Sequence, residues 1–353
     1  MKNKKVTVAM SGGIDSAVAA LLVLRDGYDT CGATMKLCEK VSDDGIDLAE
    51  QDVADARAVC ERIGIEHFVY DMSREFHATV INDFIDTYYK GGTPNPCIVC
   101  NKHLKFGCLL DEAIKNGSDF VATGHYAQTE IREDGRILLK KATDAQKDQT
   151  YMLWSLSQYQ LQHTLFPLGQ LTKPEIRKIG EENGFVIAHK SDSQDICFVP
   201  DGDYASFIEK EKGEKYPAGE YIDEDGNVLG KHKGIIHYTI GQRKGLGISM
   251  GRHIFVTKKD AESNTVTLAD EDKLFTRTVV IRGINLIPFD RIDGKIRIKA
   301  KIRYRHAESD AFAEQTGDDE ITLTFDEPQR APAPGQSAVL YDGDYVVGGG
   351  IIQ

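Results

Sequence analysis

The sequence lacks the features of membrane and secreted proteins. None of its apolar runs approaches the roughly 20 residues that a membrane-spanning helix requires. No apolar signal segment follows the charged start, so we expect a cytoplasmic protein without a membrane partner. The seven cysteines are odd in number and irregularly spaced, which excludes the disulfide framework of a small secreted protein. Functional cysteines are therefore expected to act as thiols.

The chain also lacks an excess of positive charge. Its formal net charge of −12 opposes nonspecific binding to nucleic acid, although a local basic face stays compatible with that charge. Hydrophobic residues make up 41% and charged residues 28% of the 353 residues, which is typical of a soluble globular protein. The length indicates two or three domains.

Short apolar runs alternate with helical stretches over the first 126 residues, which is typical of a parallel sheet covered by helices. We expect strands at residues 6–10, 30–37, 67–71 and 119–124, and helices at 16–25, 48–63 and 101–115. A hairpin at 128–141 and helices at 149–164 and 173–182 are expected next. Beyond residue 216, Gly, Pro and β-branched residues dominate. We therefore expect an α/β domain at 1–205 and two small, mainly β domains at 206–272 and 273–353.

A glycine loop, Ser-Gly-Gly-Ile-Asp-Ser, follows the first expected strand at residues 11–16. A strand, a glycine loop and a helix start together present backbone N–H groups to an anion. The loop lacks the Gly-Lys-Ser/Thr of a P-loop and the spacing of a dinucleotide fingerprint, which argues against kinases and dehydrogenases. Asp15 would repel phosphate unless a divalent cation bridged them, which implies Mg²⁺. The alternative is a glycine turn that merely begins a helix.

Three cysteines lie in contexts that favour chemistry. Cys97 and Cys100 form a Cys-x-x-Cys at an expected helix entrance, where the positive helix end lowers a thiol's pKa, and Cys100 is the better-placed thiolate. Cys197 lies in a polar loop at residues 191–198. A zinc site lacks its remaining ligands, and a thioredoxin-like couple lacks its context. Inert, buried cysteines are expected at Cys31, Cys60 and Cys108.

The glycine loop resembles the signature of the ATP pyrophosphatases, or PP-loop enzymes, which leave an adenylate on a substrate oxygen. With further blocks in the same order, nearly the whole chain resembles the tRNA-specific 2-thiouridylase family. These blocks lie at residues 33–36, 91–96, 100–101, 122–126, 147–149, 193–198 and 237–243. The resemblance implies an adenine-nucleotide hydrolase-like first domain, a central adaptor domain and a C-terminal β-barrel that binds tRNA.

The resemblance also implies a reaction. ATP is held by the loop, and the C2 oxygen of the wobble uridine attacks its α phosphate. Cys197 carries a persulfide, supplied by a donor such as a cysteine desulfurase or a sulfur-carrier protein, and delivers the sulfur to C2. Cys100 assists as acid or base and then forms a disulfide with Cys197. The nucleotide-binding residues implied are Ser11, Gly12, Gly13, Asp15, Ser16, Met35 and Gly124.

One departure from the family pattern leaves a second sulfur route open. The family often has an aspartate where this chain has Cys97. Three thiolates from Cys97, Cys100 and Cys197 are able to hold a 4Fe–4S cluster whose free iron binds sulfide. The sequence does not choose between this route and the persulfide.

A basic strand suggests how an acidic protein binds RNA. Residues 295–305 alternate six basic residues with mostly apolar ones, which places the charges on one face of a strand. The resemblance implies that tRNA for lysine, glutamate and glutamine binds, with Asn95, Pro96 and Cys97 at the target base. Further tRNA contacts are implied for His125, Lys147, Asp148, Gln149, Arg303, Tyr304 and Gln336.

Two other functions remain as alternatives. A synthetase that adenylylates a small metabolite needs an ammonia source and no basic strand or paired thiols, so those features disfavour it. A nucleic-acid-binding protein with a redox or metal centre and no catalysis leaves the glycine loop without a role. Uptake of ATP without turnover favours this second alternative.

Overall fold

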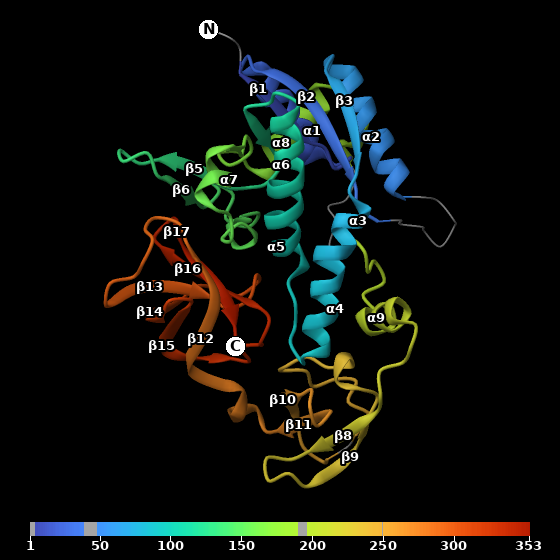
Figure 1. The fold of residues 1–353 in the computed structure, drawn as a ribbon, viewed down its shortest axis with the longest axis vertical. Helices are drawn as coiled ribbons and strands as arrows, with labels where there is room; N and C mark the ends of the chain where they lie inside the picture. Colours follow the sequence, from blue (N-terminus) through green and yellow to red (C-terminus); the bar gives the residue numbers. More distant parts are fainter. Residues whose placement is uncertain (1–3, 39–47, 190–195, 249) are drawn as a thin grey trace. The chain divides into compact units, whose positions relative to one another are not determined.

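The computed structural model describes residues 4–38, 48–189, 196–248 and 250–353. The chain divides into two compact units, each built from separate stretches of sequence (Figure 1). Unit 1 comprises Met1–Val80, Cys97–Phe198 and Asp344–Val346, and unit 2 comprises Ile81–Pro96, Val199–Gly343 and Val347–Gln353.

Unit 1 is built on a parallel sheet with the strand order β3-β2-β1-β4-β7. Val6 and Val8 of the central strand are fully buried, as expected for a strand covered on both faces. The strands are β1 (Lys5–Ala9), β2 (Asp29–Lys36), β3 (Glu66–Asp71), β4 (Phe120–Ala122) and β7 (Thr164–Leu165). The predicted parallel sheet is confirmed, and β7 is an additional short strand.

The helices of unit 1 match the predictions in part. Residues 96–115 are helical throughout, so this helix begins five residues before its expected start. The segment expected as one helix at 149–164 is instead broken into η3, α7 and β7. The helices are α1 (Ile14–Arg25), α2 (Leu48–Ile63), α5 (Pro96–Cys100), η2 (Asn101–Cys108), α6 (Leu109–Lys115), η3 (Thr150–Met152), α7 (Gln158–Gln162), α8 (Lys173–Glu182) and η4 (Val186–His189). The expected hairpin forms from β5 (Gln128–Ile131) and β6 (Ile137–Lys140).

A helical stretch that the sequence patterns did not indicate runs from residue 73 to 89. It consists of α3 (Ser73–Phe76), the π-helical η1 (His77–Ile81) and α4 (Asn82–Tyr89). The stretch ends before Gly91, whose φ of +80° is a left-handed conformation that favours glycine. The next helical residue is Pro96, so residues 92–95 form an irregular segment that leads into α5.

The first part of unit 2 beyond residue 199 contains a helix and a small sheet. The helix, α9 (Tyr204–Lys212), was also missed; Asp203 caps it by accepting from Ser206 N at 3.1 Å. The sheet has the order β10-β11-β8-β9. Its elements are β8 (Gly219–Ile222), β9 (Val228–His232), η5 (Ile235–His237), β10 (Phe255–Asp260) and β11 (Thr265–Ala269).

The last region of the chain forms a closed barrel, as predicted. Its strands follow the order β12-β15-β14-β13-β16-β17, and β17 pairs with β12 to close the ring. Alternate residues such as Ile281, Ile298 and Leu323 fill the interior. The elements are η6 (Glu271–Leu274), β12 (Phe275–Leu286), β13 (Lys295–Lys301), β14 (Ser309–Gly317), β15 (Glu320–Arg330), β16 (Ser337–Asp342) and β17 (Tyr345–Ile352).

Within the described ranges, none of the helices combines the length and the apolar character that spanning a membrane demands.

Candidate active site

The glycine loop lies between β1 and α1, at the carboxyl edge of the parallel sheet. The hydroxyl of Ser16 organises it, because Oγ donates to the Gly13 carbonyl at 2.9 Å and accepts from Ser11 N at 3.1 Å. Gly13 is the N-cap of α1 and no side chain caps the helix. The helix begins at Ile14, two residues before its expected start at Ser16. Because no side chain caps it, the backbone N–H groups of its first turn are available to an anion.

Two glycines allow a close approach around this loop. Gly12 has a φ of +71°, and a Cβ there would lie 2.6 Å from the Asp52 carbonyl oxygen. A Cβ on Gly124, just beyond β4, would lie 2.8 Å from Ser16 N. Gly124 therefore packs directly on the start of α1, and the two loops meet at the sheet edge where nucleotides bind in such folds. A helix start without a side-chain cap is suited to an anion such as phosphate.

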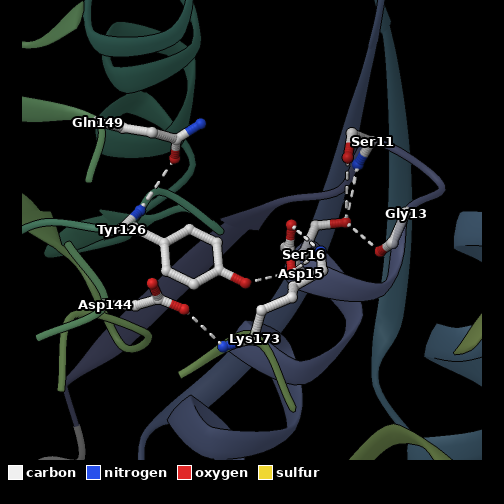
Figure 2. Close-up of polar contacts among 8 residues, drawn as sticks. All are labelled: Ser11, Gly13, Asp15, Ser16, Tyr126, Asp144, Gln149 and Lys173. Carbon is white, nitrogen blue, oxygen red and sulfur yellow. Dashed lines mark hydrogen bonds and ion pairs between the residues drawn. The ribbon is translucent and has the colours of Figure 1, made fainter. Parts of the chain in front are cut away.

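Asp15 of the loop is held by an ion pair that the sequence patterns did not indicate (Figure 2). Lys173 Nζ lies 2.8 Å from Oδ1 and 2.9 Å from Oδ2 of Asp15, and the Tyr126 hydroxyl donates to Oδ1 at 2.8 Å. Lys173 is only 6% exposed. The lysine therefore neutralises the charge for which a divalent cation was invoked, and the argument from Asp15 to Mg²⁺ is not supported. Tyr126 lies in the block at residues 122–126, whereas no motif in the sequence indicated a functional role for Lys173.

Hydrogen bonds connect this ion pair to the segment around residues 144–149 (Figure 2). Gln149 Oε1 accepts from Tyr126 N at 3.0 Å, and Gln149 N donates to the Tyr126 carbonyl at 2.9 Å. Asp144 accepts from Lys173 N at 3.0 Å. Asp148 accepts from Ala142 N and from the Thr150 hydroxyl. A tRNA contact at Lys147, Asp148 or Gln149 stays a prediction, but the segment is joined to the glycine loop.

The remaining residues predicted near nucleotide and tRNA in unit 1 are Met35 and His125. Met35 lies in β2, beside β1, and opposite Tyr70 of β3. His125 is buried against Phe106 and Phe166, and its Nδ1 lies 2.8 Å from the Thr123 hydroxyl. Burial, followed by the charge of Lys105, holds the pKa of His125 well below its usual value. In this state the side chain is buried in the protein, and its contact with tRNA stays a prediction.

The Cys-x-x-Cys thiols differ in exposure. Cys97 is exposed in the first turn of α5, whereas Cys100 ends that helix and is buried. Burial raises the pKa of Cys100 to about 12, and nearby Cys197 and Cys97 act in the same direction against Lys105. The expected lowering of the Cys100 pKa is therefore wrong. The helix begins at Pro96, which places Cys100 one turn inside it, in the protein interior.

Cys197 is exposed, whereas the next residue, Phe198, is buried. The ring of Phe198 packs edge-on against Phe76 at a centroid distance of 5.6 Å. Residues 191–195 of the predicted reactive loop lie outside the described residues. Burial also raises the pKa of Cys97, although part of this residue is exposed. Lys105 lowers that pKa and Cys197 raises it, so the three thiols lie within electrostatic reach of one another.

A metal centre has no preformed site in the part of the chain that the structure describes. There, no three side chains of His, Cys, Asp or Glu are grouped so that they would hold a metal ion. The three thiols are thus near one another without the arrangement of a ligand set. This does not favour the cluster route.

The predicted RNA-binding residues of unit 2 are engaged within the protein. Gln336 Nε2 donates to the carbonyls of Thr93 and Pro94, at 3.1 and 3.0 Å. Arg303 Nη2 donates to the carbonyls of Ile240 and Ala331, at 3.2 and 2.8 Å. Their tRNA contacts, and those of Tyr304, Asn95 and Pro96, stay predictions.

The basic strand is shorter and less positive than expected. Regular structure ends at Lys301, because residues 303–306 form a turn closed by His306 N and the Arg303 carbonyl at 3.1 Å. Up to that point the basic residues alternate with buried ones, as predicted. Arg297, however, forms a two-pronged ion pair with Asp326, at 2.9 and 2.6 Å. Acidic neighbours therefore offset part of the basic face.

Comparison with known proteins gives a consistent family. The tRNA methyl transferase HUP domain matches residues 4–201, the tRNA methyl transferase PRC-barrel domain 205–270, and the aminomethyltransferase beta-barrel domain 276–352. The tRNA-specific 2-thiouridylase MnmA of Acetivibrio thermocellus is 47% identical over 100% of both chains. Its counterpart in Clostridioides difficile is 48% identical over 99% of this chain and 98% of the relative.

Similarity to solved structures is more distant. The U34-tRNA thiolase NcsA from Methanococcus maripaludis, solved with its 4Fe–4S cluster, is 21% identical, with a TM-score of 0.36. The match covers 60% of this chain and 68% of that chain. The full-length sequence matches are decisive: the chain belongs to the tRNA-specific 2-thiouridylase family.

Proposed function

We propose that this protein is an ATP-dependent tRNA sulfurtransferase that replaces the C2 oxygen of the wobble uridine, U34, with sulfur. The observation that carries the proposal is the glycine loop braced by Gly124, in the same compact unit as Cys97, Cys100 and Cys197. The full-length similarity to named 2-thiouridylases supports it.

In the first step, the protein binds the phosphates of ATP at the glycine loop. The proposed binding residues are Ser11, Gly12, Gly13, Asp15 and Ser16, with Met35 and Gly124 near the nucleotide. Lys173, which the structure adds to this set, keeps the Asp15 carboxylate from repelling phosphate. The uridine C2 oxygen attacks the α phosphate, pyrophosphate leaves, and C2 becomes bound to a good leaving group. Mg²⁺ would screen the phosphates, although Asp15 is not required as its ligand.

In the second step, sulfur replaces the activated oxygen. We assign the persulfide to Cys197, whose exposed thiol is accessible to a sulfur donor such as a cysteine desulfurase or a sulfur-carrier protein. The terminal sulfur attacks C2 and AMP leaves. Cys100 then attacks the remaining S–S bond, which closes a disulfide with Cys197 and releases the thiolated uridine. Because Cys100 is buried with a pKa of about 12, it must be uncovered before it acts.

Of three proposed domains, the first at 1–205 and the barrel at 273–353 are proposed to bind the tRNA, in the cytoplasm, with 206–272 as an adaptor between them in sequence. Asn95, Pro96 and Cys97 would lie at the target base, which leaves its stack to reach the thiols. Two further groups of residues would contact other parts of the tRNA. They are Arg303, Tyr304 and Gln336 of the barrel, and Lys147, Asp148 and Gln149 of the first domain. The tRNAs for lysine, glutamate and glutamine are the expected substrates.

The test uses protein purified without oxygen, unmodified tRNA, ATP, Mg²⁺ and either sulfide or a persulfide donor. Thiolation of U34 that depends on ATP and releases AMP and pyrophosphate is the expected result. Active protein that contains no iron and tolerates Cys97→Ala supports the persulfide route. Iron that is lost together with activity in Cys97→Ala would support the 4Fe–4S route instead. If neither sulfur source gives thiolation, the proposed function is wrong.

A further inference from the structure

The irregular segment at residues 92–95 is held by side chains and backbone from distant parts of unit 2. It makes no helix or strand, so its carbonyls need other partners. Gln336 supplies two of them, at Thr93 and Pro94, and Thr93 N donates to the Pro334 carbonyl at 2.7 Å. The carbonyl of Gly92 accepts from Lys259 Nζ at 3.1 Å. Three consecutive carbonyls thus accept from side chains more than 160 residues away in sequence.

Lys259 connects this segment to a second sequence block. Its Nζ also donates to the Tyr238 carbonyl at 2.8 Å, and Tyr238 belongs to the block at residues 237–243. Lys259 therefore joins two of the recognised blocks, those at residues 91–96 and 237–243. The ring of Tyr88, near the end of α4, lies 5.7 Å from the same nitrogen, so the side-chain nitrogen has three neighbours that hold it in place.

The placement of Lys259 is unusual for a lysine. Among the described residues, no carboxylate forms an ion pair with it, whereas the adjacent Lys258 lies 3.9 Å from Asp260. Burial lowers the pKa of Lys259 to about 7. Removing a lysine from water without a carboxylate partner lowers the stability of the folded protein. The hydrogen bonds to the Gly92 and Tyr238 carbonyls offset part of that cost. A solvated surface lysine would not be placed in this way.

A cavity beside Lys259 allows the contact between Lys259 and the Gly92 carbonyl to be tested with small amines. The lysine lines a cavity of about 520 Å³, together with Gly91, Ile240, Thr278, Pro334 and Gln353. A small amine is able to enter such a space once the lysine side chain is removed.

We propose that Lys259 is a positioning residue for the thiolation reaction, because it fixes the Gly92 carbonyl and so sets the entry of the chain into α5. This inference rests on the proposed function. Residues 95–97, assigned to the target base, follow Gly92 by only three to five positions. Releasing Gly92 gives the segment new conformations and lowers the fraction of protein with the base-binding residues in place. Lys259 itself touches no substrate.

The first test compares Lys259→Met, which keeps the length but removes the donor, with Lys259→Arg and with Lys258→Met as the matched exposed neighbour. Lys259→Met is expected to lower kcat for thiolation by about tenfold, the scale of hydrogen bonds lost to buried carbonyls. The KM for ATP should stay unchanged, because the glycine loop is intact. Lys259→Arg should restore part of kcat, and Lys258→Met should match the wild type.

The second test is chemical rescue of Lys259→Ala. Propylammonium carries the atoms that the substitution removes and should restore kcat in a saturable manner. Tetramethylammonium has the charge but no N–H donor, and should not. Rescue by both ions or by neither would overturn the positioning role, since packing or general destabilisation would then explain the loss.

The third test does not depend on activity. Hydrogen exchange of the amides of Gly92, Thr93 and Asn95 should quicken in Lys259→Met, while the amides of β1 and β12 stay as in the wild type. If the wild-type protein fails to thiolate tRNA, the proposed function is wrong. The exchange measurement would still show whether Lys259 holds the segment at residues 92–95. Exchange and kcat that are both unchanged in Lys259→Met overturn the inference and leave the proposed function standing.

Discussion

Lys173 Nζ lies 2.8 Å from Oδ1 and 2.9 Å from Oδ2 of Asp15, although the two residues are 158 positions apart. The pair joins the first turn of α8 to the loop after β1. A buried ammonium with a carboxylate partner is costly to separate, so each residue fixes the other. The glycine loop is thus presented with its acidic side chain already neutralised.

Removing this lysine should disable the use of ATP. We expect Lys173→Met to lower the rate of tRNA-dependent AMP formation by about 100-fold, because Asp15 regains an uncompensated charge beside phosphate. The measurement is AMP release from labelled ATP. Lys178→Ala, in the same helix but exposed, is the matched control. Equal rates in both variants would show that the ion pair has no part in ATP use.

The hydroxyl of Tyr126 should have a smaller effect. Tyr126→Phe removes one hydrogen bond to the Asp15 carboxylate and keeps the buried ring. A hydrogen bond to a charged group contributes about 1.5 kcal/mol, so the rate should fall about tenfold. Tyr159→Phe alters an exposed tyrosine and serves as the control in the same AMP assay. A loss as large as that of Lys173→Met would instead point to a collapsed loop.

The three thiols should differ in their reactivity. Cys97 and Cys197 are exposed, whereas Cys100 is buried and its pKa is raised to about 12 by burial. Iodoacetamide at pH 8 should therefore label Cys197 at least about tenfold faster than Cys100, because the thiolate is the reactive form. Cys97 is exposed but burial also raises its pKa, so it should react at an intermediate rate. Peptide mass spectrometry over time measures the three rates. In denaturant the three rates should converge; a fast Cys100 in the folded protein would contradict the burial described above.

Lys259 should make stability depend on pH. Burial lowers its pKa from 10.5 to about 7, so between these values the unfolded chain binds a proton that the folded chain lacks. The free energy of unfolding of the wild type, relative to Lys259→Met, should therefore rise with pH from 7 to 10 and stay level below 7. Urea titrations across this range measure it. Lys258→Met should show no such trend, and a level difference for Lys259→Met would mean an unperturbed lysine.

The basic strand should contribute unequally to tRNA binding. Lys299→Ala should weaken binding and reduce the slope of log affinity against log salt by about 1, as loss of one phosphate contact does. Arg297→Ala should change both less, because Arg297 is already paired with Asp326. Fluorescence anisotropy at several KCl concentrations provides the comparison. Equal effects would mean that tRNA displaces Asp326.

The sequence was sufficient where local patterns determine structure. The alternation of apolar runs and helical stretches predicted β1, β2 and β3, and the glycine loop was placed correctly after β1. The helical stretch at residues 73–89 was missed because its middle, η1, reads His-Ala-Thr-Val-Ile, and β-branched residues have low helix propensity. Tertiary packing of Phe76 and Phe84 overrides that preference.

Features that depend on long-range packing were not predictable from one sequence. The ion pair of Lys173 with Asp15 requires the fold to bring α8 beside α1. The pKa of Cys100 is raised by burial, and that burial follows from a helix that begins at Pro96, five residues before its expected start at residue 101. Gly124 was expected near the nucleotide, but its contact with Ser16 appears only when β1 and β4 are paired.

The division of the chain into interleaved units has a consequence for biosynthesis. Unit 1 includes Asp344–Val346, and the Asp344 carbonyl accepts from Lys141 N at 2.8 Å. During translation the first 198 residues leave the ribosome long before this stretch is made. The nucleotide-binding unit therefore cannot form its last hydrogen bonds until nearly the whole barrel has been synthesised. Such dependence on distant sequence slows folding and exposes unfinished surfaces to chaperones. A truncation before Asp344 would therefore remove part of the first unit as well as part of the last.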